Sequence, residues 1–119
     1  MKERDLYEIF KKKLSICLDP RTYFYYKIPD SPTGQGGNRP FDAFLVYRGV
    51  PWAIEFKSEG NHPTAYQSYH LDLMVRSGGR RLVITAGDDI GEIIEKVIVK
   101  GGENGRKRNA GKSHRASGD

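Results

Sequence analysis

Residues 39–57 read RPFDAFLVYRGVPWAIEFK, two apolar runs separated by a short link. The runs over residues 41–47 and 52–57 are rich in aromatic and β-branched side chains, which is typical of strands. The link between them, Arg48-Gly49-Val50-Pro51, is as short as the loops of β-hairpins. We therefore expect two antiparallel strands at the centre of the fold.

Three charged residues occur in these otherwise apolar strands. Because side chains alternate between the faces of a strand, Glu55 and Lys57 share one face. Counting back from the turn brings Asp42 opposite the Glu55 end of the second strand. Two neighbouring carboxylates repel each other unless a cation lies between them, and Mg²⁺ takes oxygen ligands from one or two carboxylates. The pattern predicts a metal site at Asp42 and Glu55 with Lys57 beside it, whereas Glu55 and Lys57 alone would fit an ion pair on a solvated sheet face.

The rest of the first 100 residues predicts an α/β domain with the element order αβββαβα. Apolar residues at helical spacing indicate three helices, over residues 2–17, 64–77 and 92–99. Two further strands are expected over residues 21–28 and 81–85. The segment between the first two strands, residues 29–40, contains three prolines and three glycines and is expected to be a loop. The fold class is therefore α/β, with a mixed central sheet flanked by helices.

The composition describes a soluble, basic protein. The chain has 119 residues, a formal net charge of +5 and no apolar stretch of the roughly 18 residues that a membrane-spanning helix needs. A single cysteine cannot form an internal disulfide, and with three scattered histidines it makes no structural zinc site. We expect no membrane association, a cytoplasmic location and attraction to a polyanion.

Residues 101–119 differ in composition from the rest of the chain. They contain no aliphatic residue larger than alanine, which predicts a flexible tail after a single domain over residues 1–100. The tail has five Lys or Arg against two acids, so 5 − 2 gives it a net charge of +3. Most of the surplus positive charge of the protein therefore belongs to the tail.

Asp42, followed after twelve residues by Glu55-Phe56-Lys57, resembles the signature of the PD-(D/E)XK nuclease superfamily. The loop before Asp42, the helix that carries Gln67 and the element order are similar to the Holliday junction resolvase and VRR-NUC branches. The resemblance covers nearly all of residues 1–100 and implies the restriction-endonuclease-like fold. A single residue, Phe41, separates Asp42 from the proline that the family usually has directly before it.

This resemblance implies a Mg²⁺-dependent DNA endonuclease of DNA recombination or repair, with Mn²⁺ as a substitute metal. Asp42, Glu55 and the backbone carbonyl of Phe56 would bind the metal ion. Lys57 would orient or activate the attacking water. Holliday junctions, flaps or other branched DNA are the substrates that these branches suggest.

Two more side chains are candidates for this site. Gln67 matches a position that contributes to the site in these branches, although Thr64 and Gln67 also form the pattern of a helix capping box. Resolvase-like nucleases often add a carboxylate from the first helix, where Glu3 and Glu8 are available. Glu3 deviates by about 40° from the apolar face of this helix and Glu8 by about 180°, so Glu3 is the expected metal ligand. As a first-turn acid, Glu3 could instead serve only the helix dipole.

DNA is the expected partner, and the candidate phosphate contacts are Arg39, Arg106, Lys107 and Arg108. Cleavage of both strands of a junction needs two sites, which is consistent with a homodimer, although the sequence shows no interface. Two alternatives remain open. One is a DNA-binding module of the same fold without catalysis. The other is a restriction-type enzyme, for which a domain of about 100 residues leaves little material for reading a sequence.

Overall fold

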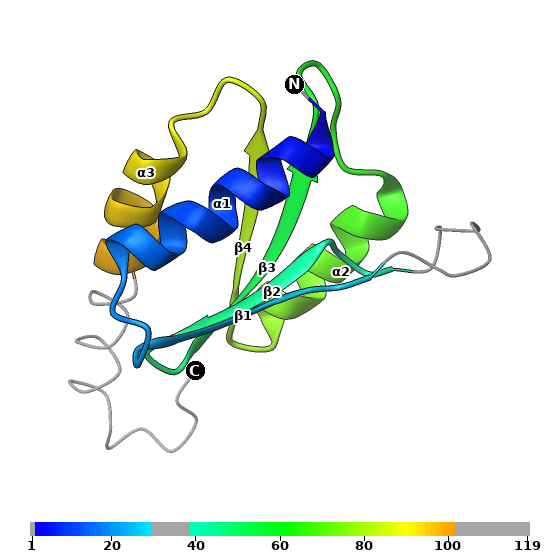
Figure 1. Cartoon of the computed structure of the whole chain (residues 1–119). Coiled ribbons are helices and arrows are strands. Elements are labelled where there is room, and N and C mark those ends of the chain that lie inside the picture. The colour runs from blue at the N-terminus through cyan, green and yellow to red at the C-terminus, as the bar shows by residue number, and fades with distance from the viewer. Residues whose placement is uncertain (1, 30–38, 102–119) are drawn as a thin grey trace.

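The computed structural model describes residues 2–29 and 39–101 (Figure 1). Its elements follow the predicted order αβββαβα: α1 (Glu3–Cys17), β1 (Tyr23–Lys27), β2 (Ala43–Tyr47), β3 (Val50–Lys57), α2 (Ala65–Arg76), β4 (Arg80–Thr85), α3 (Ile90–Ile93) and the π-helical η2 (Ile94–Val99). Nearly all of the predicted loop and tail lies outside the described residues. Across the described ranges, every helix is too short or too polar to cross a membrane.

The four strands form one mixed sheet in the order β1-β2-β3-β4. The first three strands pair antiparallel, whereas β3 and β4 are parallel and are connected by α2. A parallel pair requires such a crossover, and a helix usually provides it. β3 is an internal strand whose five residues from Trp52 to Phe56 are all buried. Its side chains therefore face packed layers on both sides of the sheet.

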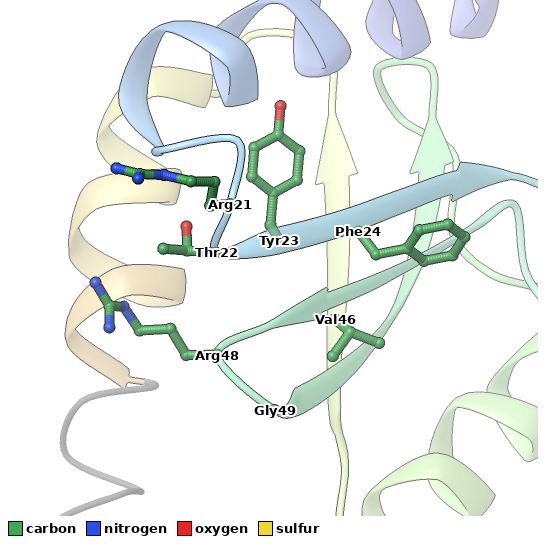
Figure 2. A pocket seen from close by; sticks show the side chains of 7 residues that line it. All are labelled: Arg21, Thr22, Tyr23, Phe24, Val46, Arg48 and Gly49. Atoms are coloured by element: carbon green, nitrogen blue, oxygen red, sulfur yellow. The ribbon is translucent and has the colours of Figure 1, made fainter.

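The hairpin between β2 and β3 is tighter than the sequence pattern predicts. β3 begins at Val50 rather than at Trp52, which leaves Arg48 and Gly49 as the whole turn (Figure 2). Both turn residues have positive φ, 48° and 84°, as two-residue hairpin loops of the primed type require. Proline is uncommon inside a strand, so the sequence predicted that β3 starts after Pro51. The register pairs Ala43 with Ile54 and so places Asp42 opposite Glu55.

The helices cover the sheet on two sides (Figure 1). α1 and the α3–η2 helix lie on one face, and α2 lies on the other. The main core lies between α1 and the face of β3 that carries its even-numbered side chains, and its central side chains are Leu6, Phe10, Leu14, Trp52, Ile54 and Phe56. Because successive residues of a strand face opposite sides, Glu55 points to the α2 side, where Leu71 is fully buried.

The last helix also starts earlier than predicted. It begins at Ile90 instead of Glu92, because the Asp89 side chain caps it by accepting a hydrogen bond of 3.1 Å from the Glu92 amide. Its buried residues, Ile90, Ile94 and Ile98, recur every four positions and pack on the main core. The other predicted element ends either coincide with the observed ones or differ from them by one or two residues.

Candidate active site

Asp42 lies directly before β2 and is held by both neighbouring strands. Its amide donates to the Ile54 carbonyl at 3.0 Å, and its carbonyl accepts from the Ile28 amide at 2.9 Å. The residue is 2% exposed, and its Oδ2 accepts a hydrogen bond of 2.9 Å from the Phe56 amide. The carboxylate is therefore fixed against β3, and the insertion of Phe41 after Pro40 does not turn Asp42 away from that strand.

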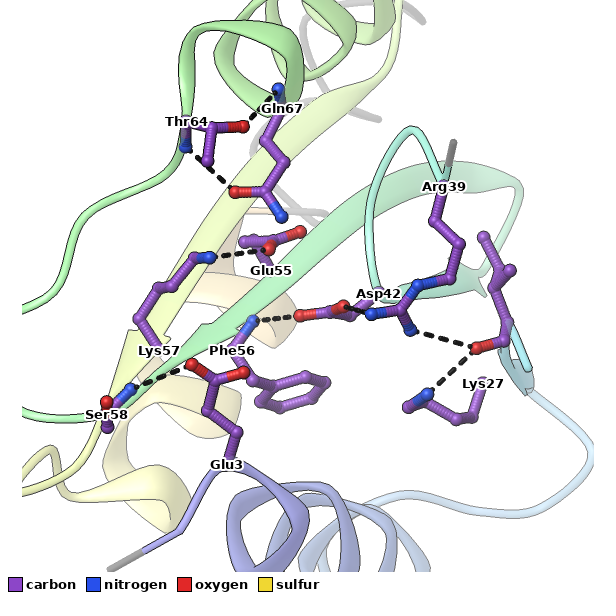
Figure 3. A network of polar contacts seen from close by, with 11 residues as sticks. Glu3, Lys27, Arg39, Asp42, Glu55, Phe56, Lys57, Ser58, Thr64 and Gln67 are labelled. Carbon is purple, nitrogen blue, oxygen red and sulfur yellow. Dashed lines mark hydrogen bonds and ion pairs between the residues drawn. The ribbon is translucent and has the colours of Figure 1, made fainter. Parts of the chain in front are cut away.

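Glu55 lies in the middle of the sheet with 1% of its surface exposed. The Lys57 Nζ lies 3.4 Å from Glu55 Oε2, and Lys57 is also largely buried (Figure 3). Within residues 2–29 and 39–101, no group donates a hydrogen bond to either carboxylate oxygen of Glu55. The alternative of an ion pair on a solvated sheet face is therefore wrong. Glu55 is a buried carboxylate whose oxygens have unused hydrogen-bonding and ligating capacity.

The environment of Glu55 raises the pKa of its carboxyl above the ordinary value. Burial raises the pKa of Glu55 to about 7, the negative charge of Asp42 raises it further, and the Lys57 ammonium lowers it in part. The direction follows because burial and the nearby charge of Asp42 together disfavour the ionised form of Glu55 more strongly than the Lys57 ammonium favours it. A divalent cation between Asp42 and Glu55 would remove this penalty.

Glu3 reaches the same end of β3 from the other side of the sheet. The Ser58 amide, one residue after Lys57, donates to Glu3 Oε2 at 3.4 Å, and Figure 3 shows the Glu3 side chain directed toward this strand end. Glu8 is exposed on the opposite side of α1. The predicted orientations of the two acids are thus confirmed, while a role of Glu3 at a metal ion stays a prediction.

Gln67 forms the helix cap that its sequence pattern indicates. The Thr64 amide donates to Gln67 Oε1 at 2.9 Å, and the Gln67 amide donates to Thr64 Oγ1 at 3.2 Å. The carboxamide nitrogen of Gln67 points toward Glu55 in Figure 3. The capping interpretation is confirmed, and because the cap uses only the oxygen, it leaves the predicted role of Gln67 at the site open.

Arg39 is a second cation beside the two buried carboxylates, in addition to Lys57. Its guanidinium lies 3.1 Å from Asp42 Oδ1 and donates to the Ile28 carbonyl at 3.3 Å. The Arg39 side chain is 21% exposed, so most of it is buried against the Asp42 carboxylate while part of it remains accessible to solvent. The sequence suggested Arg39 as a phosphate contact, and that role stays a prediction. The other candidate phosphate contacts, Arg106, Lys107 and Arg108, lie outside the described residues.

Sequence reasoning missed Tyr7 as a neighbour of the site. Its ring centroid is 4.9 Å from that of Phe56, and the Lys27 ammonium lies 4.3 Å from the Tyr7 ring centroid. Burial, followed by the negative charge of Asp42, raises the pKa of Tyr7 to about 12. The available signal was its helical spacing from Glu3, which places both on the sheet side of α1.

The donor set suits a hard cation. Asp42 and Glu55 offer carboxylate oxygens, and the carbonyl of Phe56 lies on the same strand. In the described part of the chain, no three or more His, Cys, Asp or Glu side chains form a group that could hold a metal ion. Mg²⁺ needs no such group, because it commonly uses one or two carboxylates together with water and substrate phosphate. Zn²⁺ normally requires three or four protein ligands and fits less well.

One comparison with known proteins, that with solved structures, supports the fold. No family model matches the sequence, and no curated protein is significantly similar to it. A solved structure described as "VRR_NUC domain" superposes with a TM-score of 0.59 at 22% sequence identity, covering 80% of this chain and 96% of that chain. The restriction-endonuclease-like architecture is thereby confirmed. The protein has the fold of a VRR-NUC domain, as the Asp42 and Glu55-Phe56-Lys57 pattern predicts.

Proposed function

We propose that the protein is a metal-dependent endonuclease that hydrolyses phosphodiester bonds of DNA. One observation carries this proposal: two buried carboxylates, Asp42 and Glu55, meet beside the Lys57 ammonium at one end of the central strand. Burying these charges costs free energy that neither packing nor hydrogen bonding at Glu55 recovers. The likeness to a VRR-NUC domain supports a nuclease over other uses of such a site.

Magnesium fits the residues that are present. Asp42, Glu55 and the Phe56 carbonyl would hold it, and the two Glu55 oxygens without hydrogen bonds are free to act as ligands. When bound there, Mg²⁺ would polarise the scissile phosphate and lower the pKa of an attacking water. Mn²⁺ has the same preference for oxygen ligands and is expected to substitute.

The protein's own groups would divide the remaining work. The Phe56 amide keeps Asp42 oriented toward β3. The Lys57 ammonium, next to Glu55, would orient the attacking water and neutralise negative charge developing on the phosphate. Glu3, on the other side of the same strand end, would orient the water from the opposite direction. The proposal extends to branched DNA in recombination or repair, and to a homodimer if both strands of a junction are cut.

Glu55→Gln should reduce single-turnover cleavage of DNA in Mg²⁺ by at least about a hundredfold, because it replaces a metal ligand without changing its size. The assay would use labelled linear, flap and four-way DNAs. Glu59→Gln is the matched control, since Glu59 is exposed just beyond the same strand. Near wild-type cleavage by Glu55→Gln would refute the proposed function, and folded variants should still bind DNA in EDTA.

Glu3→Gln should slow single-turnover cleavage at least about tenfold, whereas Glu8→Gln should leave the rate near wild type. The reason is geometric: Glu3 faces the end of β3, and Glu8 faces solvent on the same helix. Equal rates for the two variants, or a larger loss for Glu8→Gln, would remove Glu3 from the site.

The stability of the metal-free protein should fall as pH rises from about 4.5 to about 7, the range between the ordinary and the raised pKa of Glu55. In this range the folded state keeps a proton on Glu55 that the unfolded state has released, so rising pH favours unfolding. The loss is at most about 3 kcal/mol. Melting temperatures in EDTA would show it as a decline of wild type relative to Glu55→Gln. Mg²⁺ should offset the decline, and parallel pH profiles of the two proteins would contradict the assignment.

A further inference from the structure

A basic and aromatic surface lies along the outer edge of β1, at the end of the sheet away from Asp42. Two hollows meet there at Tyr23. One is lined by Lys11 and Lys12 of α1, and the other by groups of β1 and of the hairpin turn (Figure 2). We call the residues Lys11, Lys12, Arg21, Tyr23, Phe24, Tyr26 and Arg48 the β1-edge surface.

Positive charge dominates the β1-edge surface. Of the described residues, the acid that lines the first hollow is Glu8, and the Asp19 carboxylate pairs with Arg21 at 2.9 Å. Lys11 and Lys12 form no ion pair with any residue of the described ranges. Arg48 stands at the hairpin tip, on the same side as Arg21 in Figure 2. Such a surplus of cations attracts phosphates.

Exposed aromatic rings lie on the sheet face opposite α1, across the free edge of β1 from Lys11 and Lys12. Phe24 is 59% exposed and Tyr26 51% exposed, and they occupy alternate positions of β1 about 7 Å apart on one face of the strand. The intervening Tyr25 faces the core, with its ring centroid 5.5 Å from that of Phe10. Exposed rings on a sheet surface beside Lys and Arg are the usual means of binding unpaired bases, because every base can stack on them.

The β1-edge surface is continuous with the candidate active site through the sheet. The residue after β1, Ile28, donates its amide to the Asp42 carbonyl, and Lys27 pairs with Ala43. Arg48 lies six residues along the chain from Asp42, a span of about 20 Å in extended strand. A strand of nucleic acid that leaves the site along β1 would therefore pass Tyr26 and Phe24 before it reaches Arg48.

We propose that the β1-edge surface binds an unpaired single strand of the DNA substrate, with bases stacked on Phe24 and Tyr26, a phosphate on Arg48 and, around the free edge of β1, phosphates on Lys11 and Lys12. That the strand belongs to a substrate rests on the proposed function. The binding itself does not depend on cleavage, so it is measured without metal.

The experiment measures binding of the full chain to a labelled single-stranded DNA of about 12 nucleotides, within the usual range of single-strand site sizes, in EDTA. Lys11→Gln/Lys12→Gln should weaken binding and reduce the slope of log affinity against log salt by about 1.4, since each lost phosphate contact removes about 0.7. Phe24→Ser should weaken binding about fivefold or more. The matched controls are Lys96→Gln/Lys100→Gln, with the same charge change on exposed positions of the last helix, and Val97→Ser.

Unchanged affinity in the Lys11→Gln/Lys12→Gln variant, or an equal loss in its control, would overturn the proposal. Loss of duplex binding with single-strand binding intact would also overturn it. The free edge of β1 could instead pair with a second copy of the chain, in which case Phe24→Ser would lower the molar mass in solution without changing DNA affinity. The two lysines are exposed, so their variant decides the matter even if Phe24→Ser fails to fold. Cleavage lost in Glu55→Gln with single-strand binding retained would separate this surface from the active site.

Discussion

The structure depends on how a small domain accommodates two carboxylates buried side by side. Asp42 is held by a backbone amide of β3 and by the Arg39 guanidinium, so its charge is balanced within the protein. Glu55 has only the Lys57 ammonium and accepts no hydrogen bond from the described residues. This asymmetry leaves Glu55 as the weakly compensated partner. A cation is the species that would complete the site.

The surrounding fold explains why these groups stay in place. β3 is internal to the sheet, and its alternation directs Trp52, Ile54 and Phe56 into the core and Glu55 toward α2. Any shift of one residue in the hairpin register would exchange these faces. The two-residue turn at Arg48-Gly49 prevents that shift, so the position of Asp42 opposite Glu55 follows from turn geometry. Structural stability and the geometry of the site thus have a common origin.

Local sequence patterns predicted the parts of the fold that depend on local physics. Helical spacing and strand-forming composition predicted the helices and strands of the described residues, and the short hairpin link predicted that Asp42 lies opposite Glu55. The same spacing separated Glu3 from Glu8. Two features of the site depend on tertiary packing and were not predicted. They are the ion pair of Arg39 with the buried Asp42 and the contact of Tyr7 with Phe56, which joins elements far apart in the sequence. The start of β3 at Val50 was missed because a proline, such as Pro51, is uncommon inside a strand and so favoured a later start.

The central claim is that Asp42 and Glu55 together bind one divalent cation, and calorimetric titration of the metal-free protein with Mn²⁺ tests it most directly. Wild type should show a single saturable site whose binding releases a proton at pH values below the raised pKa of Glu55, because the metal displaces that proton. Glu55→Gln should lose the site, while the exposed Glu59→Gln should keep it. Mn²⁺ binding by Glu55→Gln with wild-type affinity and proton release would contradict the account.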